Sequence, residues 1–298
     1  MRILLLGKNG QVGWELQRSL STLGDVTALD RTASHGLTGD LADLEGLRAT
    51  IRSCQPDIIV NAAAYTAVDQ AEQQQDLAEL INARAPSLLA EEALRLGALL
   101  VHYSTDYVFD GSGTLPWLET DSPAPINQYG AGKLAGERAI LASGCKHLIF
   151  RTSWVYASRA KNFLITMQRF IRERETLSIV ADQIGAPTSA ELIADVTAVA
   201  IRRALQDPQT HGLYHLAATG ETSWHGYAVT IAEWLVQHGV DLKAATASIN
   251  AISTADYPTP ARRPLNSRLD TRKLCTAFEV VLPPWQAGVS RALAELPL

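Results

Sequence analysis

Short continuous runs of apolar residues recur along the chain, separated by longer segments in which apolar residues return every three or four positions. Continuous runs suit strands that are buried on both faces of a parallel sheet, and the longer spacing is typical of helices. The alternation of the two patterns predicts an α/β fold with a doubly wound parallel sheet. The five apolar runs lie at residues 2–6, 26–30, 57–64, 98–105 and 147–154.

Helical spacing is clearest at about residues 12–23 and at 89–97, where Gly97 suits a C-terminal cap. After about residue 156 the pattern loosens, and short strand candidates separate the helices. The proline-rich, basic segment at 257–270 suits an ordered loop. Three later helices are expected near residues 160–174, 189–205 and 224–238.

This change of pattern predicts two domains. We expect a first domain over residues 1–156, built on the parallel sheet, and a smaller α/β domain over 157–298. One later run, GLYHLA (212–217), has the composition of a buried strand. Part of 190–220 is therefore expected to return to the first sheet.

Composition narrows the class of protein. The 298 residues are 47% hydrophobic, which suits a globular chain, and the 26 basic and 31 acidic side chains are mixed along it. Nucleic acid is an unsuitable partner, because no basic stripe is present, and no apolar window reaches the ~20 residues that span a bilayer. Cys54, Cys145 and Cys275 are scattered without metal-site spacing, so we expect reduced thiols in a cytoplasmic protein.

A glycine-rich turn follows the first strand. Gly7, Gly10 and Gly13 occur in GKNGQVG, just before the first helix. Glycines at this place allow a tight turn and let the backbone approach a pyrophosphate at the positive end of a helix. The GxxGxxG spacing departs from the stricter GxGxxG fingerprint, so a turn without a ligand stays an alternative.

An acidic residue supports a dinucleotide site. Asp30 ends the second strand candidate, where a carboxylate can accept hydrogen bonds from the adenosine ribose of NADH. Arg31 could instead receive the 2′-phosphate of NADPH. Residues 39–41 (GDL) could lie against the adenine, and the small residues of NAAAYT (61–66) leave room for a cofactor. The first domain is therefore expected to be a Rossmann domain.

A tyrosine and a lysine stand four positions apart in PINQYGAGKLAGE (125–137). On a helix Tyr129 and Lys133 would share one face, and the lysine charge could stabilise a phenolate. Such a pair is also common on ordinary helix surfaces. Upstream, the strand at 98–105 ends near Thr105 and Asp106, at the sheet edge where ligands bind in open α/β folds.

Seven motifs that together cover nearly the whole chain resemble the extended short-chain dehydrogenase/reductase family, and within it the branch that reduces 4-keto sugars attached to dTDP. Four of the motifs go beyond the general family and make the resemblance specific. The seven are GKNGQVGWELQ, DIIVNAAAYTAVDQAE, VHYSTDYVFDG, PINQYGAGKLAGE, FRTSWVY, DQIGAPT and YPTPARRPLNSRL.

The resemblance implies roles for particular residues. The catalytic set of the family matches Thr105, Tyr129 and Lys133. In the implied reaction Tyr129 protonates the sugar oxygen, and Lys133 keeps the phenol pKa near working pH and holds the nicotinamide ribose. The implied substrate contacts are Thr105, Asp106, Tyr129 and Trp154. The implied cofactor contacts, for NADPH or NADH, are Gly10, Gln11, Val12, Asp30, Asp40, Leu41, Ala62, Ala63 and Ala64. Gly7, Gly13, Arg31, Tyr129 and Lys133 are expected to contact the cofactor as well.

Further expectations concern the diphosphate and the quaternary structure. Arg262 and Arg263 are candidates for the nucleotide diphosphate, since guanidinium groups pair well with phosphate. The resemblance also implies Mg²⁺ held by carboxylates of two subunits in a homodimer. The positions that match these metal ligands are Glu15, Glu191 and Glu295.

Two classes of rival function stay open, a different enzyme of the same fold and a binding subunit. A sugar-nucleotide epimerase-reductase would need a Cys or His near the sugar, and Cys145 stands before a strand, away from the expected site. A dehydratase would carry a second carboxylate after Asp106, where this chain has Tyr107. A non-catalytic nucleotide-binding subunit, similar to the regulatory subunit of methionine adenosyltransferase, would share the fold without turnover.

Overall fold

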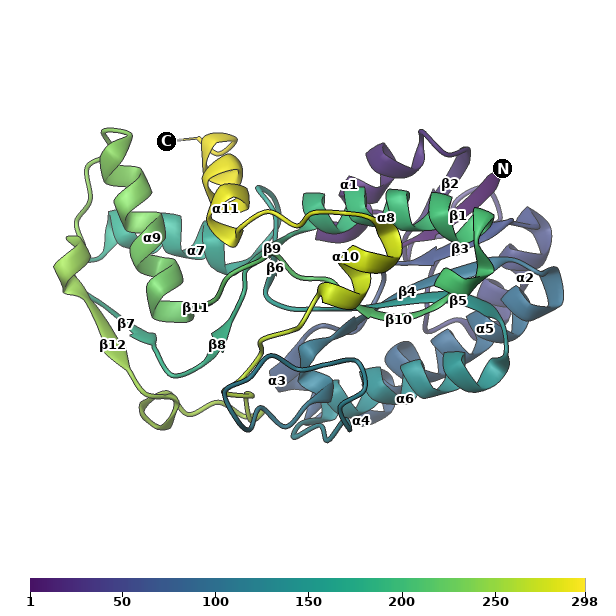
Figure 1. Cartoon of the computed structure of the whole chain (residues 1–298), viewed down its shortest axis with the longest axis horizontal. Helices are drawn as coiled ribbons and strands as arrows, with labels where there is room; N and C mark the ends of the chain where they lie inside the picture. The colour runs from purple at the N-terminus through teal and green to yellow at the C-terminus, as the bar shows by residue number, and fades with distance from the viewer. Residues whose placement is uncertain (298) are drawn as a thin grey trace.

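Six parallel strands form the centre of the molecule. The computed structural model describes residues 1–297 and orders the strands β10-β5-β4-β3-β1-β2 (Figure 1). The order reverses between β1 and β3, which is the switch point of a doubly wound sheet. The α/β fold class predicted from the sequence is thus confirmed. The strands are β1 Arg2–Leu6, β2 Asp25–Leu29, β3 Ile58–Asn61, β4 Leu99–Thr105, β5 Lys146–Thr152 and β10 Gly212–His215.

Helices cover both faces of this sheet (Figure 1). α1 (Gln11–Leu20) and α8 (Ala190–Gln206) pack on one face, and α2 (Leu44–Cys54), α5 (Ala85–Leu96) and α6 (Gln128–Ser143) pack on the other. Successive strand residues point to opposite faces, so each continuous apolar run fills two cores.

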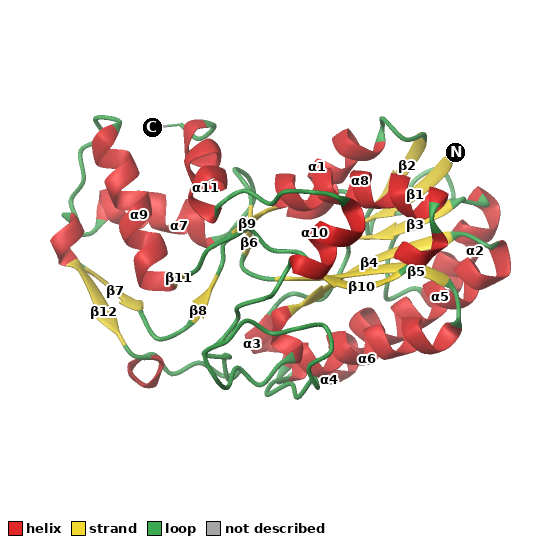
Figure 2. Ribbon diagram, viewed as in Figure 1, coloured by secondary structure: helices red, strands yellow, loops and turns green. Residues whose placement is uncertain are grey.

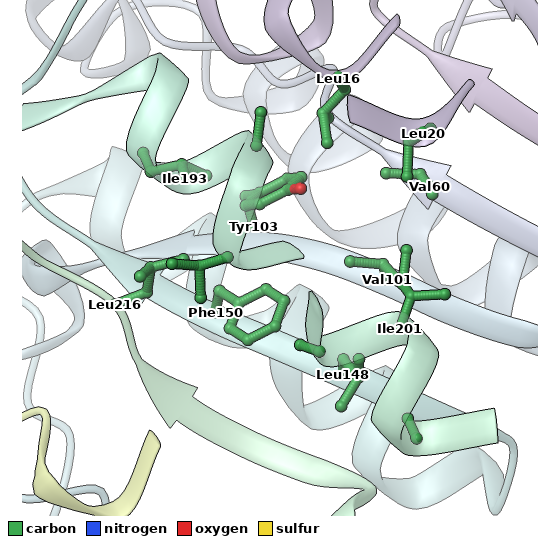
Figure 3. Packing of buried hydrophobic residues seen from close by; sticks show 14 of the residues in the cluster. Leu16, Leu20, Val60, Val101, Tyr103, Leu148, Phe150, Ile193, Ile201 and Leu216 are labelled. Atoms are coloured by element: carbon green, nitrogen blue, oxygen red, sulfur yellow. The ribbon is translucent and has the colours of Figure 1, made fainter. Parts of the chain in front are cut away.

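The core under α1 and α8 is shown in Figure 3. Leu16 and Leu20 of α1 and Ile193 of α8 lie over Tyr103 and Phe150 of the sheet. The Tyr103 hydroxyl is hydrogen-bonded to Thr197 at 2.8 Å, so the one polar atom of this tyrosine ring is satisfied inside the core.

The helices and strands that carry a second hydrophobic cluster lie beyond the end of the sheet (Figure 2). Tyr156, Tyr227 and Trp285 are buried at its centre. Its helices are α7 Phe163–Glu173, α9 Trp224–Gln237 and α11 Trp285–Ala294, and its strands are β7 Leu177–Val180 and β12 Ile249–Ile252. The pair β6 (Val155–Tyr156) and β9 (Thr188–Ser189) connects it to the sheet.

Short elements complete the described residues. The first four residues of the run at 212–217 form β10, which pairs with β5 and is covered by α10. None of the helices within residues 1–297 is both long and apolar enough to cross a membrane. The remaining elements are α3 Val68–Ala71, α4 Gln75–Glu79, η1 Leu80–Arg84, η2 Asp106–Val108, β8 Ile184–Gly185, η3 Pro208–Thr210, β11 Thr222–Ser223, η4 Thr246–Ser248, η5 Thr254–Asp256 and α10 Arg272–Phe278.

Element ends differ from the expected ones where the backbone turns. The helix expected over 12–23 ends at Leu20, and Gly24 then passes so close to Met1 that a Cβ would lie 2.2 Å from its carbonyl oxygen. The strand expected over 147–154 ends at Thr152, because Trp154 adopts a left-handed φ of 49°. The segment 257–270 is a loop, as expected, apart from isolated bridges.

Candidate active site

The glycine turn between β1 and α1 has the geometry that its sequence predicts. Gly7 has a φ of 88°, and a Cβ there would lie 2.8 Å from the Ala63 backbone nitrogen. Gly10 is the N-cap of α1, and no side chain of residues 1–297 caps its free N–H groups. These groups form the positive end of a helix dipole, which is suited to a phosphate.

Gly13 lets α1 lie directly on the turn. A Cβ at this position would stand 2.0 Å from the Gly7 carbonyl oxygen. We expect Gly13→Ala to lower the free energy of unfolding by about 1–3 kcal/mol, because the helix must move off the strand. Urea unfolding measures this loss.

Gly132→Ala is the matched control for Gly13→Ala. Gly132 also lies within a helix, α6, but the nearest heavy atom to its added Cβ is 3.5 Å away. Alanine there is expected to stabilise by about 0.5–1 kcal/mol, because it reduces the entropy of the unfolded chain. Equal effects of the two alanines would contradict the packing argument.

The segments that we expect to hold the cofactor meet at the carboxyl ends of β1, β2 and β3. Gly39 donates its N–H to the Asp30 carbonyl at 3.0 Å, which places residues 39–41 beside Asp30. The Leu41 side chain is buried in the core, so only its backbone is available to a ligand. The Asp40 carboxylate accepts the Ala42 N–H at 3.0 Å. The half-buried residues 62–64 face the glycine turn.

Asp30 is surrounded by groups that the sequence analysis did not name. Its carboxylate accepts hydrogen bonds from the Asn9 amide and, at 2.8 Å, from the Thr32 N–H. The Lys8 ammonium lies 4.0 Å away, and Arg31 is exposed next to it in sequence. The carboxylate is thus partly compensated by a nearby cation, which reduces its repulsion of a phosphate.

The end of β4 presents two polar side chains that are almost fully buried. The Thr105 hydroxyl donates to Asp106 Oδ1 at 3.0 Å and accepts the Tyr107 N–H at 3.1 Å. Burial raises the pKa of Asp106 to about 6, although hydrogen bonds from Ser267 and Thr105 act in the opposite direction. This carboxyl group therefore changes charge within the physiological range.

The raised pKa makes Asp106 a source of pH-dependent stability. The folded protein holds this proton up to about pH 6, whereas the unfolded chain releases it near 3.8, so the contribution is full below pH 3.8 and lost as pH rises to about 6. We expect the free energy of unfolding of Asp106→Asn to increase by about 3 kcal/mol relative to that of the parent chain as pH rises from 4 to 8. Urea unfolding at several pH values measures the difference.

Asp110→Asn is the matched control for Asp106→Asn. The pKa of Asp110 is lowered by hydrogen bonds from Ser112. The ionised carboxylate contributes to the stability of the fold above pH 3.8, and this contribution is lost as pH falls. Asp110→Asn should therefore lose stability relative to the parent as pH rises, which is the opposite sign. A difference for Asp106→Asn that is constant with pH would refute the titration of Asp106.

Tyr129 and Lys133 lie in the first two turns of α6, as their spacing predicts. The helix begins at Gln128 because Asn127 caps it, with its side chain accepting the Gly130 N–H at 2.8 Å. Gly130 is required here, since a Cβ would lie 2.1 Å from the Tyr107 carbonyl oxygen. This close approach brings the start of α6 against the end of β4.

The phenol of Tyr129 lies beside the end of β4 and the residues that follow it. Burial raises its pKa to about 12, hydrogen bonding with Thr105 lowers it, and the Asp106 charge raises it. The Tyr107 ring meets it edge-on, with 5.7 Å between ring centroids. Thr105, Asp106 and Tyr129 are therefore brought together, and the phenol stays protonated at neutral pH.

Lys133 points into the fold, not toward solvent. Its Nζ donates to the Tyr103 carbonyl at 2.6 Å and lies 3.3 Å from His102 Nε2. Burial lowers the pKa of Lys133 to about 8. The expectation that Lys133 brings the phenol pKa near neutrality is wrong for this structure, because burial dominates the phenol and the lysine nitrogen faces β4.

Trp154 follows β5, whose last residue, Thr152, pairs with Thr105 of β4. Its indole stacks on Trp224 of α9 at a centroid distance of 3.8 Å. The left-handed φ of 49° turns the chain at this point, and Gly185 makes room for the ring. A partly exposed aromatic platform thus stands at the carboxyl edge of the sheet, between the two hydrophobic clusters.

The two arginines of the loop 257–270 have different surroundings. Arg262 is exposed, and its carbonyl accepts the Asn127 Nδ2 at 2.8 Å, which ties the loop to the start of α6. Arg263 pairs with Asp69 at 2.9 Å. The Nη1 atom of Arg263 is buried and has no hydrogen-bond partner within residues 1–297.

The carboxylates expected to hold magnesium are neighbours, but they have other partners. Glu191 and Glu295 both approach Arg291, at 2.8 and 3.8 Å, and Glu15 lies 3.7 Å from Arg18. In the described part of the chain, no three His, Cys, Asp or Glu side chains are grouped so as to hold a metal ion. The structure of one chain therefore does not support the predicted magnesium site.

Sequence reasoning missed several residues around this site. Asn127 carried a detectable pattern, because asparagine directly before a helix is a favoured N-cap. Asn61 and His102 lie inside apolar strands, where nothing local distinguishes them from satisfied core residues. Asp69 and Ser267 reach the site from distant segments and were not detectable from spacing alone.

The chain was compared with protein families, with known proteins and with solved structures, and each comparison found close similarity over nearly its whole length. A family model described as "RmlD substrate binding domain" matches residues 1–297. A dTDP-4-dehydrorhamnose reductase of Escherichia coli K12 is 55% identical over 296 residues, covering 99% of this chain and 98% of the relative. One from Burkholderia thailandensis is 47% identical and covers 99% of both chains. The solved structure of dTDP-4-dehydrorhamnose reductase from Bacillus anthracis, in complex with NADP, is 35% identical, with a TM-score of 0.86 and 99% coverage of both chains.

Proposed function

The chain belongs to the dTDP-4-dehydrorhamnose reductase family, and we propose that it reduces the C4 keto group of dTDP-4-dehydro-L-rhamnose to give dTDP-L-rhamnose. It is an NAD(P)H-dependent oxidoreductase of dTDP-rhamnose biosynthesis. The observation that carries the mechanism is the close approach of α6 to the end of β4, which sets the Tyr129 ring edge-on to the ring of Tyr107, two residues after Thr105.

Tyr129 is the proposed proton donor. A bound nicotinamide supplies the hydride, and the ketone oxygen gains negative charge as the hydride reaches C4. A phenol with a pKa of about 12 is fully protonated at neutral pH, and an alkoxide is a stronger base than a phenolate. Transfer of the phenolic proton to O4 is therefore downhill.

Thr105 holds the donor in place. A hydroxyl can donate one hydrogen bond and accept two, and Thr105 already donates to Asp106 and accepts from Tyr107. Once the proton has moved, the Thr105 O–H can turn from Asp106 and donate to the phenolate oxygen of Tyr129, which agrees with the lowering of the phenol pKa by Thr105. Thr105 thus orients the phenol, and Asp106 orients Thr105.

The cofactor is proposed to lie along the carboxyl ends of β1, β2 and β3. Its pyrophosphate would meet the N–H groups at Gly10, Gln11 and Val12, and its adenosine ribose would meet Asp30. Lys8 offsets the Asp30 charge and the exposed Arg31 follows it in sequence, so we propose that both NADH and NADPH are accepted. Lys133 is proposed to hold the nicotinamide ribose.

The sugar nucleotide is proposed to lie between the sheet and the second hydrophobic cluster. Trp154, backed by Trp224, offers an aromatic face, and Arg263 offers a guanidinium nitrogen without a partner. Arg263 fits the diphosphate better than Arg262, because Asp69 fixes its orientation. With this placement, the expected first domain, residues 1–156, would bind the cofactor, and the expected second domain, residues 157–298, would contribute to binding the sugar nucleotide.

The rival functions lack groups that they need. Cys145 is buried immediately before β5, at the amino edge of the sheet, opposite to Thr105. Asp106 is followed by Tyr107, not by a second carboxylate. Reduction is therefore favoured over epimerisation or dehydration, and turnover distinguishes it from a regulatory binding subunit.

The test is an assay of purified protein with dTDP-4-dehydro-L-rhamnose and either NADPH or NADH, followed at the nicotinamide absorbance. We expect oxidation of the cofactor that depends on the keto sugar, and dTDP-L-rhamnose as product. Binding of the sugar nucleotide without cofactor oxidation would favour the non-catalytic alternative. Activity with only one of the two cofactors would contradict the proposal that a nearby cation offsets the Asp30 charge enough for both to bind.

The homodimer remains a prediction, and its dependence on magnesium can be tested. Because Glu191 and Glu295 both already pair with Arg291, we expect the mass in solution to be the same with and without EDTA. Light scattering after size-exclusion chromatography measures this mass. A dimer that dissociates in EDTA would instead support a metal held by carboxylates of two subunits.

The cytoplasm is the compartment that we propose for this reaction. Cys54, Cys145 and Cys275 form no disulfide among the described residues, and reduced thiols suit that compartment.

A further inference from the structure

The first turn of α6 is supported by a side chain from outside the helix. α6 begins at Gln128, and Tyr129 is its second residue. The Glu72 carboxylate, directly after α3, accepts the Gln128 N–H at 2.9 Å. The two residues are 56 positions apart in the chain, and they meet because α3 packs against α6 (Figure 1). The proposed proton donor thus follows directly after a residue whose backbone is held by another element.

This support matters because the first N–H groups of a helix have no partner within the helix, and helix ends fray when those groups stay free. In α6, Glu72 accepts the Gln128 N–H, and Asn127 accepts the Gly130 N–H. A carboxylate at this place is also favoured by the positive end of the helix dipole. The two side chains therefore satisfy backbone N–H groups on both sides of Tyr129.

α3 also holds the loop 257–270. Asp69 stands three residues before Glu72, and its carboxylate accepts the Ala261 N–H at 3.2 Å. The same carboxylate pairs at 2.9 Å with Arg263, the arginine that is proposed to meet the diphosphate. One short helix therefore connects a residue of the proposed substrate site with the start of the helix that carries the proposed proton donor.

A further hydrogen bond closes a ring among these three segments. The Asn127 Nδ2 donates to the Arg262 carbonyl at 2.8 Å, so the start of α6 is also tied directly to the loop. α3, the loop and α6 are thus joined pairwise, and a displacement of one segment strains the bonds to the other two. Within this ring, the bond from Gln128 to Glu72 is the one that acts on the residue next to Tyr129.

The place of a proton donor must be exact, because a misplacement of about 1 Å can cost about 100-fold in rate. Tyr129 lies in the turn of α6 that is the first to fray at this end. We propose that Glu72 is a positioning residue: by holding the Gln128 N–H, it fixes the first turn of α6 and with it the place of the Tyr129 phenol. This inference rests on the proposed function, since that function makes Tyr129 the donor.

Amide hydrogen exchange, followed by NMR of ¹⁵N-labelled protein, tests the hold on α6 without any turnover. We expect the Gln128 amide to exchange about tenfold faster in Glu72→Ala than in the parent chain, because this N–H loses its cap. Glu72→Gln should exchange at nearly the parent rate, since an amide oxygen can accept the same hydrogen bond. Equal exchange in Glu72→Ala and the parent chain would overturn the proposal, whether or not the protein reduces the keto sugar.

Steady-state kinetics tests the effect on the proton donor. Glu72→Ala is expected to lower kcat for the keto sugar by about tenfold and to leave the KM for NADPH within about twofold of the parent value, because Glu72 acts on the donor and not on cofactor binding. Glu72→Gln should recover most of the rate. Faster exchange at Gln128 together with an unchanged kcat in Glu72→Ala would overturn the positioning role.

Glu79→Ala is the matched control. Glu79 ends the neighbouring helix α4 and is exposed, and within residues 1–297 its carboxylate makes no hydrogen bond to α6. The control should leave both the exchange at Gln128 and kcat unchanged, and an equal loss of kcat in Glu72→Ala and Glu79→Ala would overturn the role of Glu72. Absence of turnover in the parent chain would refute the proposed function and the positioning role with it, and the exchange rates distinguish that case from an absent cap.

Discussion

Replacing Tyr129 with phenylalanine is expected to reduce turnover of the keto sugar by about 10²–10⁴-fold, because the alkoxide then lacks its positioned proton donor. The ring keeps its edge-on packing with Tyr107, so the fold should be unchanged. Cofactor oxidation measures the rate, and fluorescence titration with NADPH measures cofactor binding. We expect the cofactor dissociation constant of Tyr129→Phe to match that of the parent enzyme.

Tyr107→Phe is the control for this variant. Tyr107 is the nearest aromatic neighbour of Tyr129 and also loses only a hydroxyl, but it has no role in the proposed proton transfer. Its turnover should stay within about threefold of the parent rate, which corresponds to less than 1 kcal/mol in the barrier. Full turnover by Tyr129→Phe, or an equal loss in both variants, would exclude Tyr129 as the donor.

Glu137→Gln is expected to cause the largest loss of stability. The Glu137 carboxylate and the Arg151 guanidinium are almost fully buried and form two hydrogen bonds, at 2.9 and 2.7 Å. Glutamine would leave the arginine charge unpaired inside the fold, and breaking a buried pair in this way costs about 3–5 kcal/mol. The free energy of unfolding in urea measures the loss.

Two comparisons sharpen this test. Glu173→Gln breaks the exposed pair of Arg169 and Glu173, whose side chains are 61% and 59% exposed, and it should cost less than about 1 kcal/mol. The double variant Arg151→Met with Glu137→Leu removes both charges and should recover part of the loss. If all three proteins were equally stable, the buried charge would not be the cause.

The sequence alone indicated the main strands of the parallel sheet, several of its helices and the chemistry of the glycine turn. These depend on near neighbours: a continuous apolar run, a glycine with a left-handed φ at position 7, and an asparagine that starts α6. The Tyr129 and Lys133 pair was also readable, because four residues on a helix place two side chains on one face. Periodicity and capping act within one or two turns, so no fold was needed to see them.

Only the tertiary structure decided where those side chains point and what surrounds them. Lys133 faces His102 of β4, 31 residues away, and Asn127 bonds to the Arg262 carbonyl, 135 residues away. Contacts of this kind arise when strands pair and helices cover them, and their spacing in sequence carries no regular pattern. Burial then set the pKa of Asp106, Tyr129 and Lys133, because desolvation depends on every element packed around a group.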